Sequence, residues 1–231
     1  MTLNEDLQRE VRDIFRSRWA ERDGRIVPSP EDLSLGNDAV KLDACVLYAD
    51  MSDSTDLVDD YEPQFAAEVY KSYLTCAARI LKSEGATITA YDGDRIMAVF
   101  VGDSQASAAA RAGLKLNSAV LDIINPALLA QYNAEYRLSH VVGIDCSPLF
   151  ASRIGVRNDN DIVWVGRSAN YAAKLCALNE PNTVYITGDV FDRLDRASKC
   201  GGERNELMWS ERRWTQRGNM RIHSSQWKWR V

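Results

Sequence analysis

The sequence predicts an α+β fold in which helices cover one side of a mainly antiparallel sheet. Two observations lead to this prediction. Apolar runs of strand length and amphipathic helical segments follow each other in the order β-α-β-β-α-β-β-α-β. Two of the strands flank a tight Asp-Gly-Asp turn, which is typical of a hairpin. Adjacent strands mixed with helices favour an α+β sandwich over a purely parallel sheet.

Each element follows from its periodicity and from the residues that end it. The run ACVLYA reads as a buried strand, and Gly85 ends a helix with one apolar face. The expected strands are 44–49, 87–91, 96–101, 137–146, 161–165 and 183–187, with a final strand pair around 225–231. The expected helices are 62–83, 103–124, 168–178 and 188–196.

The N-terminal segment forms a separate part of the predicted organisation. Residues 4–22 place apolar side chains at helical spacing, which predicts an amphipathic helix that must pack on its own domain or on a second copy. Residues 23–42 contain Pro28, Pro30 and Gly36 and are predicted to be a linker. We therefore divide the chain into an N-terminal helix and linker, 1–42, and one domain, 43–231.

The composition is that of a globular protein. Of 231 residues, 45% are hydrophobic and 26% are charged, and the formal net charge of −5 disfavours nucleic acid as a partner. No apolar run reaches the ~18 residues of a membrane span and the N-terminus does not resemble a signal peptide, so we expect a cytoplasmic protein. The five scattered cysteines predict buried free thiols.

Two aspartates have a context that suggests metal binding. Asp50 ends a predicted buried strand, and Asp94 closes the turn of the hairpin expected beside it. Two carboxylates at adjacent strand ends can hold two divalent cations, which activate a hydroxyl and neutralise a triphosphate. The alternative is that Asp50 is a helix cap and Asp94 an ordinary turn residue, because aspartate is common in turns.

A glycine turn leads into a helix with a second candidate group. Asn170 lies in its first turn, and Lys174 follows one turn later on the same face. An amide and a cation at this spacing suit a ribose and a phosphorane that develops charge. An amphipathic helix with a solvated lysine explains the pattern equally well.

Together these features resemble the class III adenylate and guanylate cyclase catalytic domain. The resemblance covers roughly residues 43–190 in the segments VLYADMSDST, YDGDRIMAVF, VGIDCSP and VGRSANYAAKL. They match the family's metal aspartate, its hairpin, a core strand and its VN-x-AARL helix. Four motifs in the right order are more specific than any one alone. The resemblance implies the family's ferredoxin-like (palm-type) fold and identifies 43–231 as a nucleotidyl cyclase catalytic domain.

The resemblance also implies a head-to-tail homodimer with composite sites. Asp50, Asp94 and Met51 of one protomer would bind two divalent cations, Mg²⁺ or Mn²⁺. Asn170 and Lys174 would come from the other protomer. The family usually has arginine at the position of Lys174, and lysine keeps the charge without the bidentate fork.

The implied reaction is the cyclisation of a nucleoside triphosphate. The ribose 3′-OH attacks the α-phosphate and pyrophosphate leaves. Ser54 and Thr55, after the first metal aspartate, are assigned to substrate binding. Arg217 is assigned with them because it stands beside Gly218, where the family has a triphosphate-binding Lys-Gly pair.

The chain departs from the family where the family reads the base. Adenylate cyclases carry Lys and Asp, and guanylate cyclases Glu and Cys, at the positions of Ala90 and Val163. Tyr91 could offer a hydroxyl or a stacking face to a smaller base. This pattern resembles the pyrimidine (uridylate) cyclases of Pycsar antiphage systems. It implies that UTP, or else CTP, is converted to a cyclic nucleotide such as cUMP, which acts on a separate effector.

Two other functions stay open. An adenylate or guanylate cyclase could use atypical base contacts, and a catalytically degenerate domain could bind a nucleotide only to regulate. The basic segment 212–231, with Trp214, Trp227 and Trp229, could contact lipid or nucleic acid. We favour strands with core aromatics there.

Overall fold

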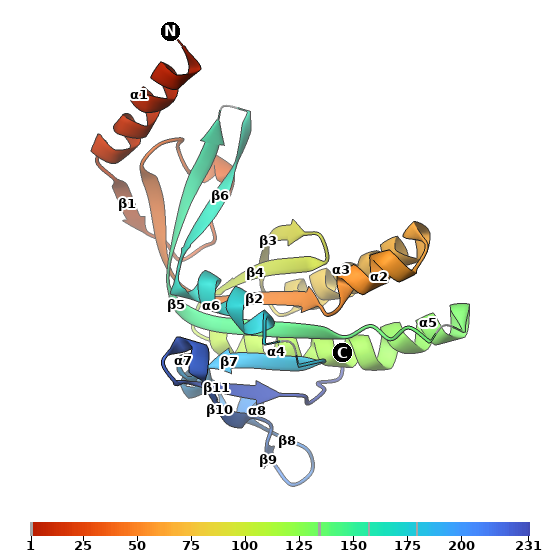
Figure 1. Cartoon of the computed structure of the whole chain (residues 1–231). Helices are drawn as coiled ribbons and strands as arrows, with labels where there is room; N and C mark the ends of the chain where they lie inside the picture. Colours follow the sequence, from red (N-terminus) through yellow and green to blue (C-terminus); the bar gives the residue numbers. More distant parts are fainter. Residues whose placement is uncertain (1, 134, 157, 179) are drawn as a thin grey trace.

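The computed structural model describes residues 2–133, 135–156, 158–178 and 180–231. Within these ranges nine strands form one sheet with the order β10-β11-β7-β5-β2-β4-β3, to which β1 adds at β2 and β6 at β5 (Figure 1). All its pairings are antiparallel except β1 with β2 and β5 with β7, which confirms the predicted α+β class. The strands are β1 (Ala20–Asp23), β2 (Asp38–Met51), β3 (Thr87–Asp92), β4 (Arg95–Val101), β5 (His140–Val156), β6 (Asp159–Gly166), β7 (Thr183–Thr187), β10 (Ser210–Trp214) and β11 (Met220–Ser225), with a separate pair, β8 (Cys200–Gly201) and β9 (Glu206–Leu207).

The prediction that helices cover one side of the sheet is wrong in this detail, because helices lie on both faces, although unequally (Figure 1). They are α1 (Leu3–Arg16), α2 (Ser54–Asp60), α3 (Pro63–Ser83), α4 (Gln105–Ser118), α5 (Asn125–Tyr132), α6 (Arg167–Cys176), α7 (Gly188–Arg193) and α8 (Arg196–Lys199). A π-helical segment (Ala119–Ile124) joins α4 to α5, and short 3₁₀ helices span Pro30–Asp32 and Thr215–Arg217. No described helix is long and apolar enough to cross a membrane.

One face of the central sheet, which we call the covered face, packs against α3 and α4. Alternate residues of β2 and β4, such as Leu47 and Ile96, bury there against Tyr73 of α3 and Leu114 of α4. Alternation along a strand sends every second side chain to each face. This face therefore holds the main hydrophobic core.

The opposite face, which we call the open face, carries the other half of each strand. Tyr48 of β2, Met97 of β4 and Ala90 of β3 lie there in one apolar cluster that includes residues of α6. Helix α6 packs so closely on β5 that a side chain at position 143 would collide with the carbonyl of Ala172, and Gly143 allows this close approach. Far less of the chain covers this face.

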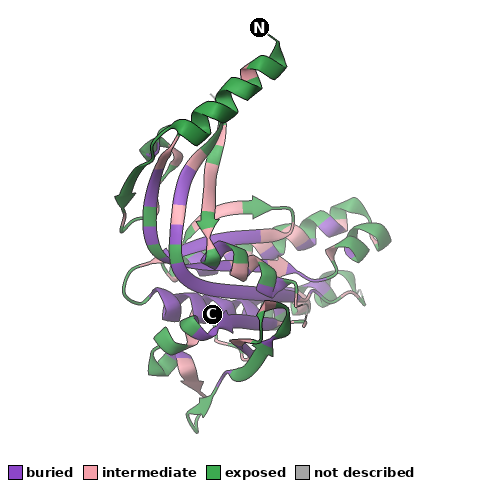
Figure 2. Cartoon of the chain, turned by 60° about the vertical axis from the view of Figure 1, so that its left-hand side comes forward, coloured by how far each residue is buried: buried purple, intermediate pink, exposed green. Residues whose placement is uncertain are grey.

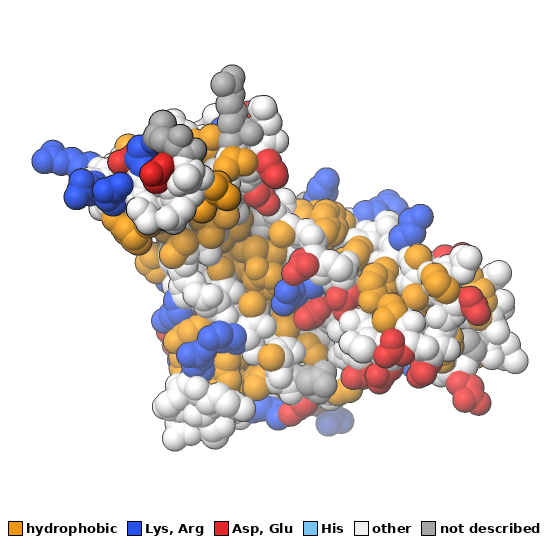
Figure 3. Space-filling model, turned by 45° about the horizontal axis from the view of Figure 1, so that its top comes forward, with side chains coloured by type: hydrophobic (Ala, Val, Ile, Leu, Met, Phe, Trp, Pro, Cys, Tyr) orange, Lys and Arg blue, Asp and Glu red, His pale blue; other side chains and the backbone are white. Residues whose placement is uncertain are grey.

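Beyond the central sheet, β1, β6 and the parts of β2 and β5 that pair with them extend as an arm (Figures 1 and 2). Figure 3 shows hydrophobic side chains in the hollow between this arm and the rest of the molecule. Helix α1 projects beyond the arm and has no buried residue. Of the two predicted alternatives for this helix, packing on its own domain is not observed, and packing on a second copy stays a prediction.

The structure corrects three further predictions. The expected linker contains a 3₁₀ helix and the first residues of β2, because Asp38–Lys41 pair with β1. The last strand pair is β10–β11, which ends at Ser225, earlier than predicted. Cys45 and Cys146, direct neighbours across β2 and β5, form a disulfide, and only Cys76, Cys176 and Cys200 are free. The division at 42/43 stays a prediction.

Candidate active site

The two predicted metal aspartates lie together at one end of the central strands. Asp50 is the penultimate residue of β2 and pairs with Arg95, the first residue of β4. The two-residue turn Gly93–Asp94 connects β3 to Arg95, so Asp94 sits directly beside this pair. Gly93 takes the positive φ of 61° that such a turn favours. The hairpin and its place beside Asp50 are as predicted.

Electrostatics shows that the two carboxylates interact. Burial and, to a smaller extent, the negative charge of Asp94 raise the pKa of Asp50 to about 6, although the positive charge of Arg95 opposes the shift. A carboxylate that is half-buried beside a like charge is destabilised in its ionised form. A divalent cation would reverse this repulsion, so the pair fits a metal site.

The remaining metal prediction concerns Met51. Its side chain is buried on the covered face, next to His140 across the strand pair, so it can offer only its backbone carbonyl. The described residues contain no group of three or more His, Cys, Asp or Glu side chains that could hold a metal ion. Two carboxylates and backbone oxygens are the donors that this end of the sheet supplies.

Sequence reasoning missed two residues that share the open face with Asp50. The guanidinium of Arg95 lies 5.5 Å from the centre of the Tyr48 ring and donates to Asp92 at 2.9 Å. The Nε of Arg95 is buried and has no hydrogen-bond partner among the described residues. An aromatic face and a hydrogen-bond donor beside the aspartate pair are groups suited to the recognition of a nucleotide base. Their adjacency depends on strand register, which the sequence alone does not show.

The predicted base contacts are not all brought together. Ala90 lies on the open face and packs with Tyr48. Tyr91 pairs with Ile96, which faces the covered core, and is 57% exposed. Val163 lies in β6 on the arm, opposite Ser152 of β5. Tyr91 is thus on the wrong face for a base that sits over Tyr48, because neighbouring residues of a strand point to opposite faces.

Helix α6 carries the two residues that were predicted to contact the ribose and the phosphate. Asn170 and Lys174 are both exposed, and none of the described hydrogen bonds or ion pairs joins either of them to Asp50 or Asp94. The guanidinium of Arg217 lies 5.7 Å from the ring of Tyr171, so the structure brings Arg217 next to this helix. The basic groups therefore gather around α6 and the acidic pair lies at the end of β2.

The remaining predicted substrate residues lie just after Asp50. Ser54 and Thr55 begin α2, behind Asp53, which takes a left-handed conformation with φ of 56°. This sharp turn follows the strand end directly. It leaves Ser54 half-buried and Thr55 exposed in the first turn of the helix.

The segment 212–231 does not form an exposed aromatic patch. Trp214 is 3% exposed, and Trp227 and Trp229 pack against the main core. The backbone N–H of Trp229 donates to the carbonyl of Leu114. Core packing of these aromatics is confirmed.

Comparison with known proteins adds evidence that the geometry alone does not give. The family described as "Adenylate and Guanylate cyclase catalytic domain" matches residues 39–223. Over their full lengths, the chain is 47% identical to a uridylate cyclase of Burkholderia cepacia and 44% identical to one of Xanthomonas perforans. It is 34% identical to a uridylate cyclase of Rhodovulum sp. over 93% of this chain and 91% of the relative.

Solved structures share the fold at low sequence identity. The adenylyl cyclase CyaB from P. aeruginosa superposes with a TM-score of 0.70 at 19% identity, over 81% of this chain and 95% of that chain. The guanylyl cyclase Cya2 superposes with a TM-score of 0.67 at 16% identity, over 81% and 91% of the two chains. Both similarities are evidence for the fold.

Proposed function

This chain belongs to the adenylate and guanylate cyclase catalytic domain family, and from that premise we propose that it is a uridylate cyclase that converts UTP to cUMP and pyrophosphate. The observation that carries the proposal is the full-length similarity, at 44–47% identity, to two proteins named uridylate cyclase. The nucleotidyl cyclase activity itself follows from the family. The base, the metals and the biological role are the proposed parts.

Asp50 and Asp94 are proposed to hold two divalent cations, Mg²⁺ or Mn²⁺. Members of this family generally use divalent metal ions, and the raised pKa of Asp50 marks a place where positive charge is needed. When bound, such ions lower the pKa of a ribose hydroxyl and neutralise phosphate charge. The role of Asp50 and Asp94 is to stay ionised and to fix the ions at the strand ends.

The remaining groups are proposed to come from a second protomer in a head-to-tail homodimer. Asn170 would orient the ribose, so that its 3′-OH faces the α-phosphate, and Lys174 would stabilise the developing charge. Arg217 would bind the leaving pyrophosphate. The exposure of Asn170 and Lys174, together with the hydrophobic hollow of Figure 3, supports a second copy on the open face. Ser54 and Thr55 would contact the triphosphate, and they belong to the protomer that supplies Asp50 and Asp94.

Tyr48 and Arg95, rather than Tyr91, are proposed to recognise the base. The Tyr48 ring offers a stacking face, and the unpaired donor of Arg95 would meet a carbonyl such as O4 of uracil. Cytosine presents an amine at that position and would repel a guanidinium donor, so we expect UTP to be preferred over CTP. The apolar Ala90 beside Tyr48 offers no partner to the polar edge of a purine.

In the cell we propose that the enzyme makes a second messenger in antiphage defence. This part rests on the resemblance of the motifs to Pycsar cyclases. Cyclic UMP would leave the enzyme and act on a separate effector protein.

The test is a substrate comparison with purified protein, Mn²⁺ and each of ATP, GTP, CTP and UTP, with the products identified by mass spectrometry. We expect cUMP to form fastest, cCMP more slowly, and purine products least. Equal or faster turnover of ATP or GTP would refute the base assignment and leave a cyclase of atypical purine contacts. No turnover of any triphosphate with Mn²⁺ or Mg²⁺ would favour a degenerate regulatory domain.

A further inference from the structure

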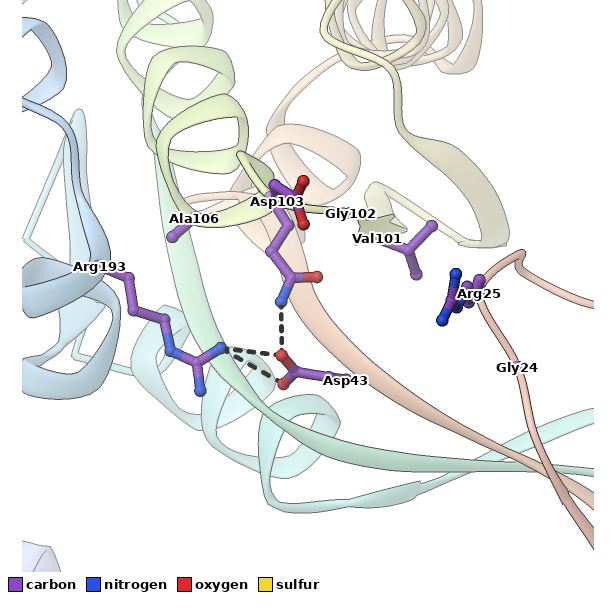
Figure 4. A pocket seen from close by; sticks show the side chains of 9 residues that line it. Gly24, Arg25, Asp43, Val101, Gly102, Asp103, Ala106 and Arg193 are labelled. Carbon is purple, nitrogen blue, oxygen red and sulfur yellow. Dashed lines mark hydrogen bonds and ion pairs between the residues drawn. The ribbon is translucent and has the colours of Figure 1, made fainter.

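A cavity lies at the end of the sheet opposite to the aspartate pair. It has a volume of about 660 Å³ and is lined by the loop after β1, the start of the central part of β2, the end of β4, the first turn of α4, and α7 (Figure 4). Asp43 in its wall is seven residues from Asp50 along the extended strand β2, a separation of about 23 Å. A molecule in this cavity is therefore not the cyclase substrate.

The strongest feature of the cavity is a buried amide that is only half satisfied. Gln105 is 7% exposed, and its Nε2 donates to the carboxylate of Asp43 at 3.2 Å. Its Oε1 is buried and has no hydrogen-bond partner among the described residues. An unpaired buried acceptor destabilises the folded state, because it has lost its hydrogen bonds to water without replacement. A donor group of a ligand would supply the missing hydrogen bond.

The charges around Gln105 are balanced. Arg193 donates to both oxygens of Asp43 at 3.3 and 3.4 Å, whereas Arg25 and Asp103 have no ion-pair partner in the described part of the chain. Figure 4 shows Arg25 and Arg193 on opposite sides of the cavity, with Asp43 and Asp103 between them. Two cations and two anions disfavour a polyphosphate and disfavour a simple cation.

We propose that this cavity binds a small zwitterion, a free α-amino acid. The ammonium group would donate to Gln105 Oε1 and to the carboxylate of Asp103, and the carboxylate group would accept from the guanidinium of Arg25. Cavities of this volume are typical of small-molecule sites. The proposal is independent of which nucleotide the enzyme cyclises.

The test is a thermal-shift screen of the full chain with each of the twenty amino acids and with inorganic phosphate. At ten times its dissociation constant, a ligand of the folded state should raise the Tm by about 3 °C. We expect at least one amino acid to do so. We expect Arg25→Met and Gln105→Met each to weaken its binding at least tenfold, measured by calorimetry. Arg213→Met, an exposed arginine paired with Glu211, serves as the control and should leave binding unchanged.

Several outcomes would overturn the proposal. A screen in which no amino acid raises the Tm, or in which only phosphate does so, excludes an amino-acid site. Binding that survives both substitutions would place the ligand elsewhere. Arg25 is exposed, so Arg25→Met should fold even if Gln105→Met does not. The Asp50→Asn variant should still bind the amino acid, which separates this inference from the cyclase assignment.

Discussion

The two faces of the central sheet belong to the same strands, but their buried polar side chains differ in whether the chain supplies them with hydrogen-bond partners. On the covered face, His140 is fully buried and lies within hydrogen-bonding distance of Tyr73 and Asn117. The Nδ2 of Asn117 donates to the carbonyl of Trp227, which leaves its Oδ1 to accept from Nε2 of His140. The Nδ1 of His140 then accepts from the Tyr73 hydroxyl. The chain itself satisfies this whole network.

On the open face the corresponding groups are left incomplete. Asp50 faces the like charge of Asp94, and the buried Nε of Arg95 has no hydrogen-bond partner within the described ranges of the chain. Burial disfavours the charged form on both faces, since it lowers the pKa of His140 to about 3 and raises that of Asp50 to about 6. A network whose polar groups are all hydrogen-bonded stabilises the fold, whereas polar groups that lack a partner are available to bind a ligand.

The largest expected effect comes from removing one carboxylate on the open face. Asp50→Asn or Asp94→Asn should lower kcat for cyclisation at least a thousandfold, because each removes a metal ligand and several kcal/mol of transition-state stabilisation. Without metal, Asp50→Asn should unfold at a higher urea concentration than wild type, since the repulsion with Asp94 is gone. Asp60→Asn, on the exposed end of α2, is the matched control. Retained turnover in either variant would contradict the metal assignment.

A second prediction tests whether the open face needs a second copy. Asp94→Asn and Lys174→Ala proteins should each be inactive, but their mixture should regain roughly a quarter of wild-type activity. Random exchange makes half of the dimers mixed, and each mixed dimer has one intact site of two. The measurement is cUMP formation after subunit exchange. A mixture as inactive as its parents would show that one protomer supplies the whole site.

The third prediction concerns the base. Arg95→Met should lower kcat/KM for UTP about tenfold to a hundredfold, the cost of losing a charged hydrogen bond, and should narrow the preference for UTP over CTP. Tyr91→Phe is the control and should change kcat/KM for UTP less than twofold, because Tyr91 faces away from Tyr48. The reverse order of effects would restore Tyr91 as the base contact.

Local patterns were sufficient to predict the order of the main elements from β2 to β7 and the proximity of Asp50 and Asp94. They missed α2, α5 and β1, and β1 begins inside the segment 4–22 that was predicted to be one helix. The hairpin around Gly93 and the apolar run before Asp50 are each fixed by a few consecutive residues, so their structure could be predicted directly, and the metal-binding role of the two aspartates stays a prediction. The strand 183–187 was predicted with its observed bounds for the same reason.

The features of the site and of the arm that the sequence did not predict share one cause, because each depends on the register in which distant strands pair. Tyr48 and Arg95 become neighbours only through the β2–β4 register, and Tyr91 changes face because a bulge between Ile88 and Ala90 shifts the β3–β4 register. The arm extends β5 to Val156, ten residues past the predicted end, because β6 pairs with it there. These features depend on which strands meet, and that information is spread over the whole chain.

The smallest expected effect is a pH dependence that distinguishes the two faces. The folded pKa of His140 is about 3, below its unfolded value of about 6.5, so the unfolded chain binds more protons and the free energy of unfolding falls as the pH drops from 6.5. The slope is about 1.4 kcal/mol per pH unit. The folded pKa of Asp50 is about 6, above its unfolded value of about 3.9, so its contribution rises as the pH drops from 6 to 4.

In metal-free wild type the two slopes therefore oppose each other between about pH 4 and 6, and urea unfolding there should depend little on pH. Asp50→Asn removes only the open-face contribution, so its free energy of unfolding should fall steeply with pH across the same window. Adding His140→Gln to that variant should flatten the profile again, whatever its absolute stability. If Asp50→Asn and wild type give the same profile, then Asp50 does not titrate near pH 6, and the repulsion that defines the open face is absent.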